Sequence, residues 1–166
     1  ELYDFFHDAV GGPLTGLFYR FIDGTEAASY DFTFPAEPAV VTSLRYANVD
    51  QTTPFDAMAN ISGDSNAPQA PSVTTTKDGR TILQFIGVDG ASGGVLTSNS
   101  VTSTVVATAE SGTAGGNAEM MITSECQAMA GATPVGSFSF SVDEWTGITL
   151  ALNAAGLSTN NTSGTS

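Results

Sequence analysis

Basic residues are scarce in this sequence. Only four of the 166 residues are Lys or Arg, against seventeen Asp or Glu, so the formal net charge is −13 at pH 7. Four cations cannot build the basic surface that binds a nucleic-acid backbone, and an anionic lipid surface repels so acidic a protein. No apolar run reaches the length of a membrane-spanning helix. We therefore expect neither a nucleic-acid partner nor membrane insertion.

Cysteine and histidine each occur once, as Cys126 and His7. A single thiol cannot form a disulfide within the chain. One histidine without a G-x-S-x-G elbow gives no support for a Ser-His-Asp mechanism. Carboxylate pairs, as in glycosidases, are the remaining route to catalysis, but acids at turns usually cap the backbone. The two pairs, both at turns, are Asp23 with Glu26 and Asp143 with Glu144. We predict that the protein is not an enzyme and needs no cofactor.

Charged residues of either sign are also few. They make up 13% of the chain, about half of the usual fraction of about 25%. Ser, Thr, Gly, Ala and Asn are abundant instead, and uncharged, hydroxyl-rich surfaces are common in extracellular and virion proteins. We expect an extracellular, cell-surface or virion location.

What the sequence does contain is apolar residues in alternation with polar ones. A period of two puts one face of an antiparallel strand in a core and the other toward water. Turn residues such as Asp23-Gly24, Asp78-Gly79 and Gly115-Gly116 separate the alternating segments. The predicted strands are 17–23, 29–34, 39–46, 81–88, 101–109, 118–126, 137–142 and 148–153. About eight strands with short Gly-rich connections predict an all-β, antiparallel two-sheet sandwich, resembling a jelly roll.

The domain organisation follows from where apolar residues stop. Residues 1–157 form one predicted domain, and 158–166 (STNNTSGTS) have nothing to bury and read as a flexible tail or linker. The aromatic side chains of the strands are expected to fill the core. They are Phe18, Tyr19, Phe21, Phe32, Phe34, Phe85, Phe138, Phe140 and Trp145.

A carbohydrate-binding site is one interpretation of the single tryptophan. The ring of Trp145 would stack on a sugar while Asp143 and Glu144 bind its hydroxyls, and Tyr46 is a further aromatic candidate. The alternative is that Trp145 anchors the start of the last core strand, because a strongly apolar strand follows it directly. On that alternative Trp145 is buried.

Calcium and glycans are two further candidate ligands. Calcium takes six to eight oxygens, often from loop acids and amides. Asp50, Asp56 and Asp89 are weak candidates, because no D-x-D-x-D loop is present. The N-x-S/T pattern marks three candidate glycosylation sites. They are Asn60, Asn160 and Asn161.

Four stretches occur in an order that resembles a known family. They are LFYRFIDGTEAASYDFTF (17–34), AVVTSLRYANVDQTTPFDA (39–57), APSVTTTKDGRTILQFIGVDG (70–90) and WTGITLALNA (145–154). Together they resemble a loosely defined family of β-sandwich modules in bacterial surface proteins and in phage tail or other virion proteins. These motifs lie at strand entries and turns, so the resemblance implies a fold and a setting but no catalytic residue.

The resemblance implies a structural module that acts by self-association in a filament or virion appendage such as a fibre, tail or capsid decoration. The alternative is a carbohydrate-binding or adhesion module. Family members have further strands before the first motif, and ELYDFFHDAVGGPL (1–14) does not read as such a strand pair. Either the chain belongs to a longer polypeptide, or a neighbouring subunit donates the missing strand to an open sheet edge.

Overall fold

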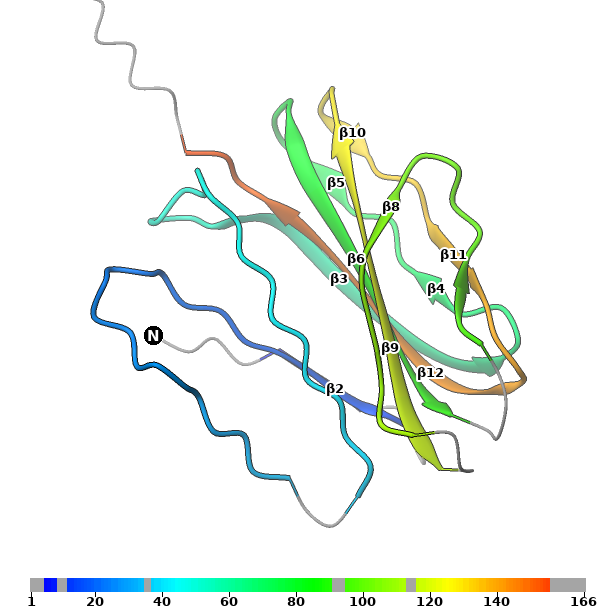
Figure 1. Cartoon of the computed structure of the whole chain (residues 1–166). Coiled ribbons are helices and arrows are strands. Elements are labelled where there is room, and N and C mark those ends of the chain that lie inside the picture. The colour runs from blue at the N-terminus through cyan, green and yellow to red at the C-terminus, as the bar shows by residue number, and fades with distance from the viewer. Residues whose placement is uncertain (1–4, 9–11, 35–36, 91–94, 113–115, 156–166) are drawn as a thin grey trace, which may run out of the picture.

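A computed structural model describes residues 5–8, 12–34, 37–90, 95–112 and 116–155, and of residues 5–8 it describes the backbone alone. These residues form strands and connecting segments without helix, as Figure 1 shows. The strands are β1 (Phe5–Asp8), β2 (Leu14–Leu17), β3 (Phe55–Ser65), β4 (Gln69–Ala70), β5 (Thr74–Thr75), β6 (Arg80–Gly90), β7 (Thr97–Ser98), β8 (Thr104–Glu110), β9 (Asn117–Gln127), β10 (Gly131–Ala132), β11 (Gly136–Ser139) and β12 (Asp143–Leu152).

The centre of the molecule is a five-stranded antiparallel sheet in the order β3-β12-β6-β9-β8. Its inner strands are long, and β6 and β12 are rich in β-branched and aromatic residues, which favour a pleated backbone. β6 pairs with β9 along its whole length, from Arg80 opposite Gln127 to Gly90 opposite Asn117. The edge strand β8 carries a register shift between Val105 and Ala107, a bulge of the kind that discourages edge-to-edge pairing.

Two small sheets, β4-β11-β7 and β10-β5, cover one face of the central sheet. Phe138 of β11 and Ala70 of β4 pack there against Ile86 of β6 and Trp145 of β12. The two layers approach so closely that a Cβ at Gly147 would collide with the Gln69 carbonyl. Glycine at position 147 is therefore required by the contact between β4 and β12.

The other face of the central sheet is covered by β2 and by residues 44–49. Leu17, Leu44 and Tyr46 pack on a cluster that includes Phe85 of β6 and Leu150 of β12. Because both faces are covered, every residue of 145–152 in β12 is buried. The alternation in that strand predicts one face toward water, and this prediction is wrong.

The predicted fold class is confirmed: the chain is an all-β antiparallel sandwich. The predicted strands 81–88 and 118–126 lie within β6 and β9, and 148–152 lie within β12. The eleven-residue strand β3 was not predicted, because FDAMANISGDS contains small residues and no sustained alternation. Residues 18–23, 29–34 and 39–46 belong to no strand, although strands are predicted there.

The first residues give a second correction. β1 pairs antiparallel with β2, from Phe5 opposite Leu17 to Asp8 opposite Leu14, although the sequence gives no indication of a strand pair here. The signal is missing because neither segment alternates over more than four residues. In the described part of the chain no helix has the length and apolarity needed to cross a membrane.

Candidate interaction surface

Residues 18–34, called here the aromatic arm, follow β2 and run away from the central sheet before the chain turns back (blue in Figure 1). Alternation continues along its first part: Tyr19 and Phe21 are half-buried, whereas Phe18 and Ile22 are exposed. The Tyr19 ring meets the Phe55 ring of β3 edge-on, with centroids 4.7 Å apart. This contact fixes the base of the arm to the edge of the sheet.

Side chains on the outer face of the arm contact one another in pairs. The Phe32 ring lies 6.5 Å from both the Phe18 ring and the Phe34 ring. Arg20 donates a hydrogen bond of 2.9 Å to the Tyr30 hydroxyl, and its guanidinium carbon lies 5.5 Å from the centre of that ring. The outer face therefore carries a row of three Phe rings and a separate pair formed by Tyr30 and Arg20.

Polar contacts hold the turn of the arm. The Glu26 carboxylate accepts hydrogen bonds from the backbone N–H groups of Asp23 and Gly24, at 2.7 and 2.9 Å, and lies 3.6 Å from the Arg20 guanidinium. Hydrogen bonds from Thr25 lower the pKa of Asp23 below its usual value. The pair Asp23 and Glu26, considered above as catalytic acids, thus forms a turn, with both carboxylates accepting hydrogen bonds from it.

The exposed aromatic residues are concentrated in the arm. Among residues whose exposure is described, every exposed aromatic side chain lies there, with Phe18, Tyr30, Phe32 and Phe34 exposed by 42–51%. The prediction that Phe18, Phe32 and Phe34 belong to the core is therefore wrong, whereas it is correct for Phe85 and Phe138. The alternation in the arm is real, but Phe32 and Phe34 on its outer face stay about half exposed among the described residues.

Trp145 is a core residue with an exposed fraction of 6%. Its ring occupies the space above Gly63 of β3, and its Nε1–H donates a hydrogen bond of 3.0 Å to Ser65 Oγ. A ring held in this way has no free face for a sugar. This burial argues against the sugar-stacking interpretation of Trp145 and agrees with the anchor interpretation.

Acidic side chains gather at the end of the central sheet where β12 begins. Glu144 is opposite Asp64 of β3. A hydrogen bond with Asp143, together with repulsion from Asp143 and Asp64, raises the pKa of Glu144. Burial and repulsion from Asp143 and Glu37 raise the pKa of Asp89 at the end of β6. Asp143 and Glu144 thus belong to a group of mutually repelling acids and do not flank an exposed aromatic ring.

The three calcium candidates lie apart and have different environments. Asp50 accepts hydrogen bonds from the backbone N–H groups of Thr52 and Thr53, which lower its pKa. Asp56 pairs with Arg80, and Asp89 lies at the opposite end of β6 from Arg80. Within the described ranges, no three His, Cys, Asp or Glu side chains are grouped so that they could hold a metal ion.

The remaining candidates are distributed as follows. Asn60 is exposed on β3, where a glycan could be attached without disturbing the core. Asn160, Asn161 and His7 fall outside the residues whose side chains are described.

Tyr46 is half-buried and lines a small pocket with Asn48 and Thr81, two residues that the sequence did not single out for a sugar site. No sequence motif marks this pocket, because its residues come from three separate segments.

Fold and surface together define a class: an all-β antiparallel sandwich with an exposed aromatic arm. No family model, no curated protein and no solved structure matches the chain.

Proposed function

We propose that the protein is a non-enzymatic structural module of an extracellular filament or virion appendage, and that it self-associates through the aromatic arm. The main support for the proposal is that every exposed aromatic side chain among the described residues lies within residues 18–34. Large apolar groups on one surface are characteristic of interaction sites, and aromatic residues with arginine dominate the binding energy of such sites.

The backbone of the arm supports the same proposal. Residues 27–34 belong to no strand, and their backbone groups make no hydrogen bond to other described backbone groups. An extended segment of this kind can add to the sheet edge of another chain, with its backbone providing affinity and its side chains providing specificity. Exposed aromatic rings beside free backbone groups therefore favour strand addition between copies.

The charge balance allows a second copy as the partner once salt screens the repulsion between copies. A strongly basic partner would bind at the acidic end of the sheet and not at the arm. The outer face of the arm carries aromatic rings and Arg20, whose charge is paired with Glu26. Copies of a protein with a net charge of −13 repel one another, so association needs screening. The hydroxyl-rich, weakly charged composition and the resemblance of the four stretches to surface and virion modules are the support for the proposed setting.

The test is the assembly state of the protein, by mass photometry and negative-stain imaging in ~0.5 M salt, where the screening length falls well below 8 Å. We expect filaments, rings or defined oligomers. Phe32→Ser and Phe34→Ser are expected to yield monomers, because both side chains are exposed within one copy and neither supports its core. Val101→Ser, at a valine that is 99% exposed outside the arm, is the matched control. A monomeric unmodified protein, or assembly that survives both arm variants, would contradict the proposal.

A further inference from the structure

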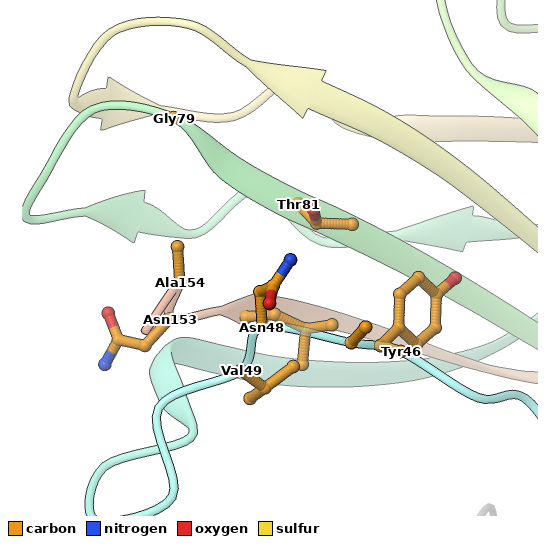
Figure 2. A pocket seen from close by; sticks show the side chains of 9 residues that line it. Tyr46, Asn48, Val49, Gly79, Thr81, Asn153 and Ala154 are labelled. Atoms are coloured by element: carbon orange, nitrogen blue, oxygen red, sulfur yellow. The ribbon is translucent and has the colours of Figure 1, made fainter. Parts of the chain in front are cut away.

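A small pocket lies on the face of the central sheet that residues 44–49 cover. Its volume is about 190 Å³. Figure 2 shows how segments 46–49, β6 and 153–154 surround it. Its wall residues are Tyr46, Ala47, Asn48, Val49, Gly79, Thr81, Leu152, Asn153 and Ala154, and none of them is charged.

Backbone hydrogen bonds fix two walls of the pocket. Ala155 donates to the Asn48 carbonyl at 2.7 Å, and Asp50 donates to the Asn153 carbonyl at 3.0 Å. Asn48 has φ +58°, the only non-glycine residue with positive φ among those described. This left-handed conformation is tolerated by asparagine better than by most residues. The backbone of this wall is therefore preorganised in the free protein.

The side chains facing the pocket have unused hydrogen-bonding groups. Among the described residues, neither the Asn48 carboxamide, the Thr81 hydroxyl nor the Tyr46 hydroxyl has a hydrogen-bond partner. Figure 2 shows the Asn48 carboxamide directed toward the side where Thr81 lies, with the Tyr46 ring beside them. The Tyr46 ring is itself positioned by its packing against the core cluster on this face. Because the Tyr46 hydroxyl points away from Asn48 in Figure 2, the pocket offers one ring, one amide and one hydroxyl, that of Thr81.

We propose that this pocket binds one ring of a neutral saccharide. The apolar face of a pyranose can pack on the Tyr46 ring, while the amide of Asn48 and the hydroxyl of Thr81 exchange hydrogen bonds with sugar hydroxyls. A net charge of −13 disfavours an anionic ligand, and the uncharged walls provide no carboxylate for a cation. The volume is below the ~300 Å³ at which pockets for drug-sized ligands begin, so it suits a single ring.

The site is independent of the proposed self-association, because it uses none of residues 18–34. The test is saturation-transfer NMR with three probes: methyl β-glucoside, methyl β-galactoside and N-acetylglucosamine. We expect at least one probe to bind with Kd of about 1 mM, a standard free energy of about −4 kcal/mol. Glucuronate, the anionic comparison, is expected to bind at least tenfold more weakly.

Two variants test the pocket without disturbing the fold. Asn48→Gly removes the carboxamide but keeps the left-handed backbone, and Thr81→Val removes a hydroxyl at nearly constant volume. We expect at least tenfold weaker binding for Asn48→Gly and a severalfold loss for Thr81→Val, with unchanged melting temperatures. Phe32→Ser in the arm should leave saccharide binding intact. Absence of transfer to all three probes, or undiminished transfer in Asn48→Gly, would overturn the assignment whatever the assembly state is.

Discussion

Arg80 and Asp56 form an ion pair in which each side chain is only 5% exposed, and Nε lies 3.1 Å from Oδ2. Asp56 also accepts hydrogen bonds from the backbone N–H and the hydroxyl of Thr76. Burial acts to raise the pKa of Asp56, but the hydrogen bonds from Thr76 and Arg80 outweigh it, and the pKa lies below its usual value. The pair joins the start of β3 to the start of β6, so one of the four basic residues has a structural role.

Replacing Asp56 should be strongly destabilising. Asp56→Asn leaves the Arg80 guanidinium buried without an opposite charge, which costs about 3 kcal/mol in the free energy of unfolding. The lowered pKa of Asp56 means that the folded protein binds the proton less readily than the unfolded chain. The stabilisation by the ion pair is therefore complete above the unfolded pKa near 3.8. It is lost as pH falls through the lower pKa of the folded state. Urea unfolding at pH 7 and at pH 3 measures both effects.

The double variant Asp56→Leu with Arg80→Met is the control for this prediction. Replacing both partners of a buried ion pair by apolar residues is often nearly neutral, because no charge stays buried alone. A double variant as unstable as Asp56→Asn would show that the loss arises from packing at these positions and not from the unpaired guanidinium.

Among the elements, β4 and β12 approach each other closely. β4 is only two residues long, yet the Gln69 carbonyl lies where a side chain at position 147 would begin. The Gln84 side chain of β6 is also buried at this interface and donates a hydrogen bond of 3.1 Å to the Pro134 carbonyl. A two-residue strand such as β4 can thus be held on the central sheet by close backbone packing and single side-chain hydrogen bonds, without a long series of strand-pairing hydrogen bonds.

A methyl group at position 147 should separate these elements. Gly147→Ala places its Cβ against a backbone carbonyl that cannot rotate away, and we expect a loss of about 3 kcal/mol, the upper end of the usual cost of overpacking. Thermal unfolding measures the change. Gly79→Ala is the comparison: its φ of +68° strains any side chain but nothing lies within 4 Å, so a loss of only about 1 kcal/mol is expected. Equal losses at both positions would contradict this account of Gly147.

At the scale of the whole molecule, acidic groups repel one another at the sheet end formed by β6, β9 and β12. Burial, together with Glu110, raises the pKa of Glu119, and burial with Asp143 and Glu37 raises the pKa of Asp89. A raised pKa means that the folded protein takes up the proton more readily than the unfolded chain. These carboxylates therefore destabilise the fold at neutral pH, and their effect fades as pH falls through the folded pKa toward the unfolded one.

Removing one of these charges should stabilise the protein at pH 7. Asp89→Asn is expected to raise the free energy of unfolding by about 0.5 kcal/mol, because half-buried acids of this kind are partly screened by solvent. The gain should shrink as pH falls through the raised folded pKa and disappear well below the unfolded pKa of 3.8, where the carboxyl of the unmodified protein is protonated in both states. Asp31→Asn removes the same formal charge from the exposed arm and is expected to have a smaller effect. A gain that is independent of pH would contradict the electrostatic explanation.

The sequence by itself determined the strand-rich class, the acidic surface and the main strands β6, β9 and β12. Those features depend on local alternation and composition, which are properties of the chain alone. Alternation also placed Phe85 and Ile148 correctly in the core, because in these strands the apolar face does meet another layer. It failed for β3, where small residues replace the alternating apolar ones.

Only the tertiary structure decided which faces are covered. The same pattern of alternating aromatics occurs in 29–34 and in 137–140, yet Phe138 is buried at 1% exposure and Phe32 remains 50% exposed. The difference arises because the central sheet, with Ile86 and Trp145, lies against Phe138, while Phe32 lies on the outer face of the arm beside the exposed Phe18 and Phe34 rings. Pairing and covering are long-range contacts between segments far apart in sequence. The pocket depends on such contacts too, because three separate segments meet at Tyr46, Thr81 and Asn153. A local pattern specifies that a side chain has an apolar face to bury, but the packing of distant elements determines whether this chain or a second copy buries it.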